Sequence, residues 1–162
     1  MSRSCHRGND KEVKRMCKES YPETELLRQV NGVGEIVSLA FMLTIDNPQR
    51  FSKSRQVGPH LGLVPRQYDS GESRPQMRIT KTGDRMMRQL LVQSAQHILG
   101  RQGKDSDLRR HGLKIAARGG KNGKKRATVA VARKLAGLLH RLWVTAEVYE
   151  PLRNSALQEK AA

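Results

Sequence analysis

Cysteines, aromatic residues and long apolar runs are all scarce in this sequence, and each shortage excludes a class of protein. The two cysteines, Cys5 and Cys17, do not stand at zinc-binding spacing, so we expect reduced, structurally incidental thiols. The histidines and acids form no ligand pattern either, and we therefore expect no metal site. Aromatic residues make up only 4% of the chain, which favours helices with an aliphatic core over a β-sandwich.

The apolar runs near 36–45 and 135–144 are too short and too interrupted to span a bilayer, so a membrane partner is not expected. Residues 2–10 are polar and basic, which leaves no apolar segment for a signal peptide and predicts a cytoplasmic protein. Acidic residues are also few, because 15 Asp and Glu stand against 31 Lys and Arg for a formal net charge of +16. So large an excess predicts a nucleic-acid partner.

Helical spacing dominates the remaining pattern, so the sequence predicts a mainly α fold. We expect a helix-hairpin-helix element, then a basic loop and a small helical domain that ends in a long helix over about 124–148. Capping patterns predict helix starts at Ser20 and Ser52, with Gly58-Pro59 ending the second of these helices. The predicted divisions are an N-terminal stub (1–20), the helix-hairpin-helix (21–50), the helical domain (51–150) and a polar tail (151–162) that lies beyond the fold.

The segment Val30-Asn31-Gly32-Val33-Gly34 stands between two predicted helices. Apolar residues at its ends and two glycines fit a helix-hairpin-helix, in which Gly32 and Gly34 allow tight backbone geometry. The following helix then presents free N–H groups to a phosphate, a contact that reads no base sequence. An ordinary turn between two helices is the alternative.

A second pattern is the loop 66–74, which places serine hydroxyls among cations. Nine Lys and Arg stand against three acids between Arg50 and Arg88. A serine in this setting can attack a phosphodiester, because guanidinium groups stabilise the charge that develops on the phosphoryl oxygens. Composition alone equally fits a simple Ser-Gly turn. The cations that we expect to contact nucleic acid here are Arg66, Arg74, Arg78, Lys81 and Arg85.

The C-terminal half has a third basic stretch, with 13 Lys and Arg against two acids from Arg101 to Arg141. It is densest at Lys121, Lys124, Lys125 and Arg126, where we expect contacts to phosphate. Asp105, Ser106 or Asp107 is expected to cap the helix that carries Leu108, and Asp84 is interpreted as a first-turn residue. His97 and His140 are predicted to lie in a core or an interface.

Three blocks of residues resemble the insertion-sequence-110 family of transposases. They are Leu61-Gly62-Leu63-Val64-Pro65-Arg66-Gln67-Tyr68, then Ser70-Gly71, and then Ile79-Thr80-Lys81-Thr82-Gly83-Asp84. The segments 27–40 and 119–143 are also similar to that family, so the resemblance covers about residues 20–150.

The resemblance implies a C-terminal transposase domain whose serine cuts and rejoins DNA, with a structured guide RNA. It also implies an N-terminal RuvC-like domain that holds Mg²⁺, and we expect that domain, and hence the ion, to be missing from this chain. By position in the Ser-Gly motif, Ser70 is the implied nucleophile and Ser73 the alternative. Where the family often has Ser-Ser-Gly-Gly, this chain has Asp69-Ser70-Gly71-Glu72, which adds negative charge beside the serine.

Three interpretations follow from these patterns. The chain is a transposase domain that depends on a metal-bearing partner. Its expected protein partners are the full-length transposase or further copies of itself. Alternatively, it is a truncated, non-catalytic remnant that still binds DNA or guide RNA. A general RNA-binding protein of ribosomal type explains the charge but not the motifs.

Overall fold

The computed structural model describes residues 3–66 and 78–161, with side chains described from 9 to 157 within those ranges. Its elements are α1 (Arg3–Glu19), α2 (Thr24–Arg28), α3 (Glu35–Ile45), η1 (Pro48–Arg50), η2 (Ser54–Gln56), α4 (Val57–His60), α5 (Arg85–Leu99), α6 (Asp107–Ala117), α7 (Gly123–Thr145) and α8 (Arg153–Ala161). The described chain is therefore mainly helical, which confirms the predicted fold class. No helix within the described ranges is both long and apolar enough to cross a membrane.

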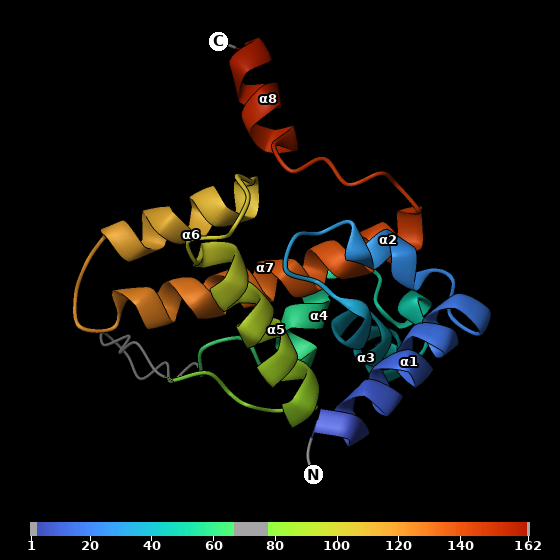
Figure 1. Cartoon of the computed structure of the whole chain (residues 1–162). Coiled ribbons are helices and arrows are strands. Elements are labelled where there is room, and N and C mark those ends of the chain that lie inside the picture. Colours follow the sequence, from blue (N-terminus) through green and yellow to red (C-terminus); the bar gives the residue numbers. More distant parts are fainter. Residues whose placement is uncertain (1–2, 67–77, 162) are drawn as a thin grey trace.

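Helix α7 runs through the middle of the molecule, and α2, α4, α5 and α6 pack around it (Figure 1). Its apolar residues Val131, Leu135 and Leu139 are completely buried. They share one continuous core with apolar side chains of α3 and α5, including Phe41 and Leu91. Burial of such side chains stabilises the fold by about 1.5–3 kcal/mol each, so α7 is the element on which the other helices depend.

The packing of α6 along α7 requires a residue without a side chain at Gly112. A Cβ atom there would lie 2.5 Å from a methyl carbon of Leu99 and 2.5 Å from one of Val131. The two helices consequently approach closely, and the side chains on either side of their seam share one surface.

Helix starts in the N-terminal half differ from the predicted ones. Ser20 caps nothing; α2 begins at Thr24, whose buried hydroxyl donates to the Tyr21 carbonyl over 2.7 Å. Ser52 does not cap either, since its hydroxyl contacts the side chain of Gln56. Gly58 and Pro59 lie inside α4 rather than ending it, because a proline in a first helical turn loses no intrahelical hydrogen bond. Tertiary packing overrides the local capping signals here.

The predicted polar tail is the largest correction to the fold. Helix α7 ends at Thr145, and residues 153–161 form α8, which projects from the rest of the molecule (Figure 1). Asp107 of α6 holds its first turn, accepting from the Asn154 backbone N–H over 2.7 Å and from the Ser155 hydroxyl over 2.6 Å. Asp107 therefore serves a distant helix, and its own helix α6 is capped by Ser106.

Candidate nucleic-acid interface

The loop that carries the serine motif begins and ends at a short antiparallel neck. Pro65 pairs with Ile79, the Arg66 N–H donates to the Arg78 carbonyl over 2.9 Å, and the Thr80 N–H donates to the Val64 carbonyl over 2.9 Å. These backbone bonds join residues 64–66 to residues 78–80. They bring Arg66 and Arg78 to opposite positions on adjacent backbone segments.

Two glycines and one arginine fix this neck to the body of the protein. A Cβ atom at Gly62 would lie 2.3 Å from the Thr82 carbonyl oxygen, and both Gly62 and Gly83 have positive φ angles. The Arg88 guanidinium donates to the carbonyls of Leu61 and Thr82 over 3.2 and 3.0 Å. Asp84 accepts from the Met87 N–H and so caps α5 itself, rather than occupying its first turn. The neck is therefore a backbone-to-backbone contact that a larger residue at position 62 would disrupt.

The cations predicted at this loop divide into two groups. Arg66, Arg78, Lys81 and Arg85 are exposed on the neck or at the start of α5. Ser70, Ser73 and Arg74 lie outside the described residues. Arg88 is tied into the fold by its hydrogen bonds to the carbonyls of Leu61 and Thr82, so its first role is structural.

A second group of cations surrounds the start of α7. Lys121, Lys124, Lys125 and Arg126 are all exposed, and no acidic residue lies in the first turn of this 23-residue helix. The positive end of the helix dipole adds to their field. Arg126 also donates to the Gly119 carbonyl over 3.0 Å, which ties the glycine turn before α7 to the helix. Cations and helix dipole together make this end of α7 strongly attractive to phosphate.

The two glycines of the predicted hairpin have different surroundings. Gly32 has a φ of +89°, and a Cβ there would lie 3.2 Å from each of three atoms of Ser94, His97 and Ile98 on α5. Gly34 is exposed, with no atom within 4 Å of a Cβ built on it. Gly32 is thus a packing residue in the described fold, while Gly34 stands open at the start of α3.

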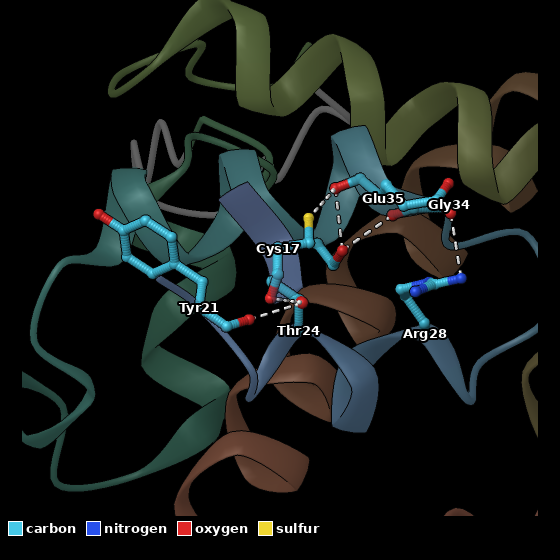
Figure 2. A network of polar contacts seen from close by, with 7 residues as sticks. Cys17, Tyr21, Thr24, Arg28, Gly34 and Glu35 are labelled. Atoms are coloured by element: carbon cyan, nitrogen blue, oxygen red, sulfur yellow. Dashed lines mark hydrogen bonds and ion pairs between the residues drawn. The ribbon is translucent and has the colours of Figure 1, made fainter. Parts of the chain in front are cut away.

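Figure 2 shows the polar contacts around the start of α3. The Glu35 carboxylate lies 3.1 Å from the Arg28 guanidinium, and the buried Cys17 thiol contacts the Glu35 carbonyl at 3.9 Å. A carboxylate in the first turn is favourable to the helix dipole. The same charge repels a phosphate, so this helix start is less positive than that of α7.

Two buried polar atoms near this turn lack a hydrogen-bond partner, the Asn31 side-chain oxygen and the Ser94 hydroxyl. Ser94 lines an open hollow of about 310 Å³ together with Gly32 and His97. His97 is exposed there, which excludes the core alternative and leaves the interface alternative as a prediction. His140 is buried as predicted, and its ring nitrogens contact the Ser54 hydroxyl at 3.0 Å and the Pro48 carbonyl at 2.8 Å.

Sequence reasoning missed a third set of cations, Arg55, Arg133, Lys134, Arg141 and Arg153. These residues line a groove of about 680 Å³ between α7, η2, α6 and the segment that leads into α8. Their spacing along the chain had no motif, and only the general excess of Lys and Arg between 101 and 141 could have indicated part of the set. In the described ranges, no three His, Cys, Asp or Glu side chains come together in a group that could hold a metal ion.

The chain is mainly helical and has a net charge of +16, with cations gathered at a loop neck and a helix start. This charge distribution is typical of the class of proteins that contact polyanions. The family model described as "Transposase IS116/IS110/IS902 family" matches residues 24–110, more than half of the chain. The chain therefore belongs to this transposase family.

Two relatives illustrate the match. A transposase for insertion sequence element IS1111A from Coxiella burnetii is 30% identical over 140 residues, which is 86% of this chain and 38% of the relative. A transposase for insertion sequence element IS1328 from Yersinia enterocolitica is 33% identical over 87 residues, 52% of this chain and 26% of the relative. The chain thus spans well under half the length of either relative.

Proposed function

We propose that this chain acts in DNA transposition as the domain that grips DNA and supplies a serine nucleophile, Ser70. The observation that carries the proposal is the neck, where Arg66 and Arg78 stand on paired backbone segments at the two ends of the loop containing Ser70. A phosphodiester that reaches this loop meets guanidinium groups from both sides. Membership of the transposase family supports DNA as the substrate.

The proposed chemistry is a transesterification. The Ser70 hydroxyl oxygen attacks phosphorus, a serine O–P bond forms, and the bond to the leaving deoxyribose oxygen breaks, with the hydroxyl proton ending on that oxygen. The reverse attack by a deoxyribose hydroxyl of another strand rejoins DNA and restores the serine. Cations at the neck stabilise the negative charge of the transition state, and the bond count is conserved without an oxidant or reductant.

A structured guide RNA is the second proposed partner, together with a full-length transposase or further copies of this chain. Two cationic regions, at the neck and at the start of α7, offer separate surfaces for two nucleic acids. Mg²⁺, which the family resemblance implies for a RuvC-like domain, does not fit a site in the described ranges, because no suitable group of ligand side chains lies there.

The test is a strand-transfer assay with the full chain, guide RNA, a DNA junction of the family's kind and a separately supplied RuvC-like domain. Denaturing gels detect a covalent protein–DNA adduct. We expect the adduct with the unaltered chain and with Ser73→Ala, the matched control, and its complete loss with Ser70→Ala. Circular dichroism checks that each variant is folded.

Loss of the adduct with Ser73→Ala alone would transfer the role to that residue and overturn the assignment of Ser70. Absence of any adduct while RNA and DNA remain bound would overturn the catalytic proposal and leave a nucleic-acid-binding remnant.

A further inference from the structure

The groove beside α7 has a cationic rim and an apolar floor. Its rim carries the five cations named above, against the carboxylates of Asp107 and Glu150. Leu138 and Leu142 of α7 form part of its floor, and Tyr149 stands in its wall. Such a combination suits a ligand that is negatively charged along one edge and flat and apolar along the other.

Three of the five groove cations, Arg55, Arg133 and Lys134, form no ion pair with a described residue. Arg141 and Arg153, by contrast, share the carboxylate of Glu147, each over 2.9 Å. Arg133 and Lys134 are adjacent on α7, so they place two uncompensated charges at one point of the groove. The aliphatic part of the Arg133 side chain lies close to α4. A Cβ atom built on Gly58 would be 2.6 Å from the Cγ atom of Arg133. The first carbons of the Arg133 side chain are thus packed against α4, and the residue itself is exposed at the groove.

His111 adds a titratable group at the α6–α7 seam, next to Gly112. Burial lowers its pKa from the ordinary 6.5, as do the nearby charges of Lys134, Arg118, Arg133 and Lys114. Arg133 and Lys134 lie on α7, Lys114 lies on α6, and Arg118 directly follows α6. Asp107, one turn earlier on α6, accepts hydrogen bonds from residues of α8. Positive charge from two adjoining elements is therefore concentrated around His111.

From Arg133 to Arg141, the helix rises about 12 Å, so the groove cations of α7 are spread along the direction of the helix. A duplex hides its base faces by stacking and offers only their edges. The apolar floor would have no partner in a duplex, whereas an unpaired strand can lay bases on the floor and phosphates along the rim.

We propose that the groove between α6, α7 and the segment 148–154 binds single-stranded DNA, with Arg133 and Lys134 as the main phosphate contacts. This inference rests on the proposed function for the choice of DNA, since transposition exposes unpaired DNA strands. It adds a strand-binding surface whose cations are not among the nucleic-acid contacts that the sequence predicted.

The test is fluorescence anisotropy with the full chain and a labelled twelve-nucleotide oligothymidylate. Loss of two phosphate contacts should make the salt dependence shallower by about 1.4 logarithmic units per decade and weaken binding roughly ten- to thirtyfold at about 0.1 M salt. We expect this result for the double variant Arg133→Gln, Lys134→Gln. The matched control is Lys11→Gln, Lys14→Gln, which removes the same charge from exposed positions on α1 and should weaken binding less than twofold.

A pH series gives a second readout. Because the His111 pKa is lowered, the imidazole is neutral at pH 7, and bound phosphates would favour its protonated form. Binding of the oligothymidylate should therefore tighten as pH falls below 6.5, and His111→Gln should flatten that dependence. Equal pH profiles for both proteins would contradict the placement of the strand beside His111.

Each remaining outcome decides the proposal. An equal loss for the α1 control, or no loss for the groove variant, overturns it. If oligouridylate binds more tightly and the double groove variant weakens its binding equally, the groove binds RNA. If polyglutamate competes as well as DNA does, the groove binds an acidic protein segment. Either result overturns the proposal for DNA. Ser70→Ala leaves the groove unaltered, so failure of the adduct assay and failure of this binding assay are separate results.

Discussion

The turn before α3 and the groove beside α7 are both candidate contacts for phosphate, but they differ in how far carboxylates neutralise their cations. At the turn, the Glu35 carboxylate pairs with Arg28 and lies in the first turn of the helix. In the groove, Arg133 and Lys134 have no described ion-pair partner. A glycine pattern thus marks a place where the backbone is tight, whereas uncompensated side-chain charge marks a place where a polyanion gains most.

The difference also concerns rigidity. The turn is packed against α5 through Gly32, while one wall of the groove is a segment tied to α6 by the side chain of Asp107. Close packing of the backbone does not depend on pH, because it involves no titrating group. Hydrogen bonds to a carboxylate are lost in acid, because the carboxylate becomes protonated.

The largest expected effect is on stability and separates the two glycines of the turn. Gly32→Ala should lower the free energy of unfolding by about 1–3 kcal/mol, because its φ of +89° and the atoms 3.2 Å away both oppose a Cβ. Gly34→Ala, at a φ of −97° and with open space around it, should cost less than about 1 kcal/mol. Urea denaturation measures both; equal losses would remove the distinction between a packing and an open glycine.

An intermediate effect should appear in acid and only on the groove side. The Asp107 pKa stays below its ordinary 3.8, because bonds to Ser155 and Asn154 outweigh the opposing effect of burial. Bonds from Arg153 and Arg141 lower the Glu147 pKa below its ordinary 4.5. A carboxyl group whose pKa is lowered in the folded protein stabilises the fold at any pH above its ordinary pKa. That stabilisation is lost as the pH falls through the lowered pKa.

Amide hydrogen exchange, corrected for intrinsic rates, should therefore show residues 148–157 losing protection below about pH 4 while residues 28–35 keep theirs. Asp107→Asn should reproduce part of the loss at pH 7. Simultaneous loss in both regions would mean that the molecule unfolds as one unit and that the carboxylate contacts have no local role.

The smallest expected effect tests charge compensation at the turn. Glu35→Gln removes the carboxylate beside the start of α3 and releases Arg28 from its ion pair, so binding of a nonspecific DNA duplex should strengthen by about twofold at low salt. Anisotropy titrations measure this, with Glu12→Gln on α1 as a control for net charge. A stronger effect from the control would show that the start of α3 lies away from bound DNA.

Periodicity was enough to predict most helices, because an apolar stripe such as Val131, Leu135 and Leu139 has one physical solution, burial against other helices. Capping signals were less reliable. Ser20 and Ser52 had suitable side chains, but the ends of α2 and η2 are decided by what their residues pack against. The helix α8 was missed because its residues are polar and its start is held by Asp107, 46 positions before the helix's first residue, Arg153.

The candidate site was predictable in part for a similar reason. A run such as Lys124, Lys125 and Arg126 is visible in the chain because its members are consecutive. The groove is invisible there, because Arg55, Arg133 and Arg153 come from three elements that only the fold brings together. Ser70 remains a prediction from the resemblance of its motif.

By itself, the sequence determined that this protein is helical, strongly basic and similar to a family of transposases, since composition, periodicity and contiguous motifs are properties of the chain. Only the tertiary structure decided which glycine is packed and which is open, which cations are neutralised by carboxylates, and where a groove forms. Those features depend on distances between residues far apart in the chain, and hydrophobic burial sets such distances only when all the helices pack together.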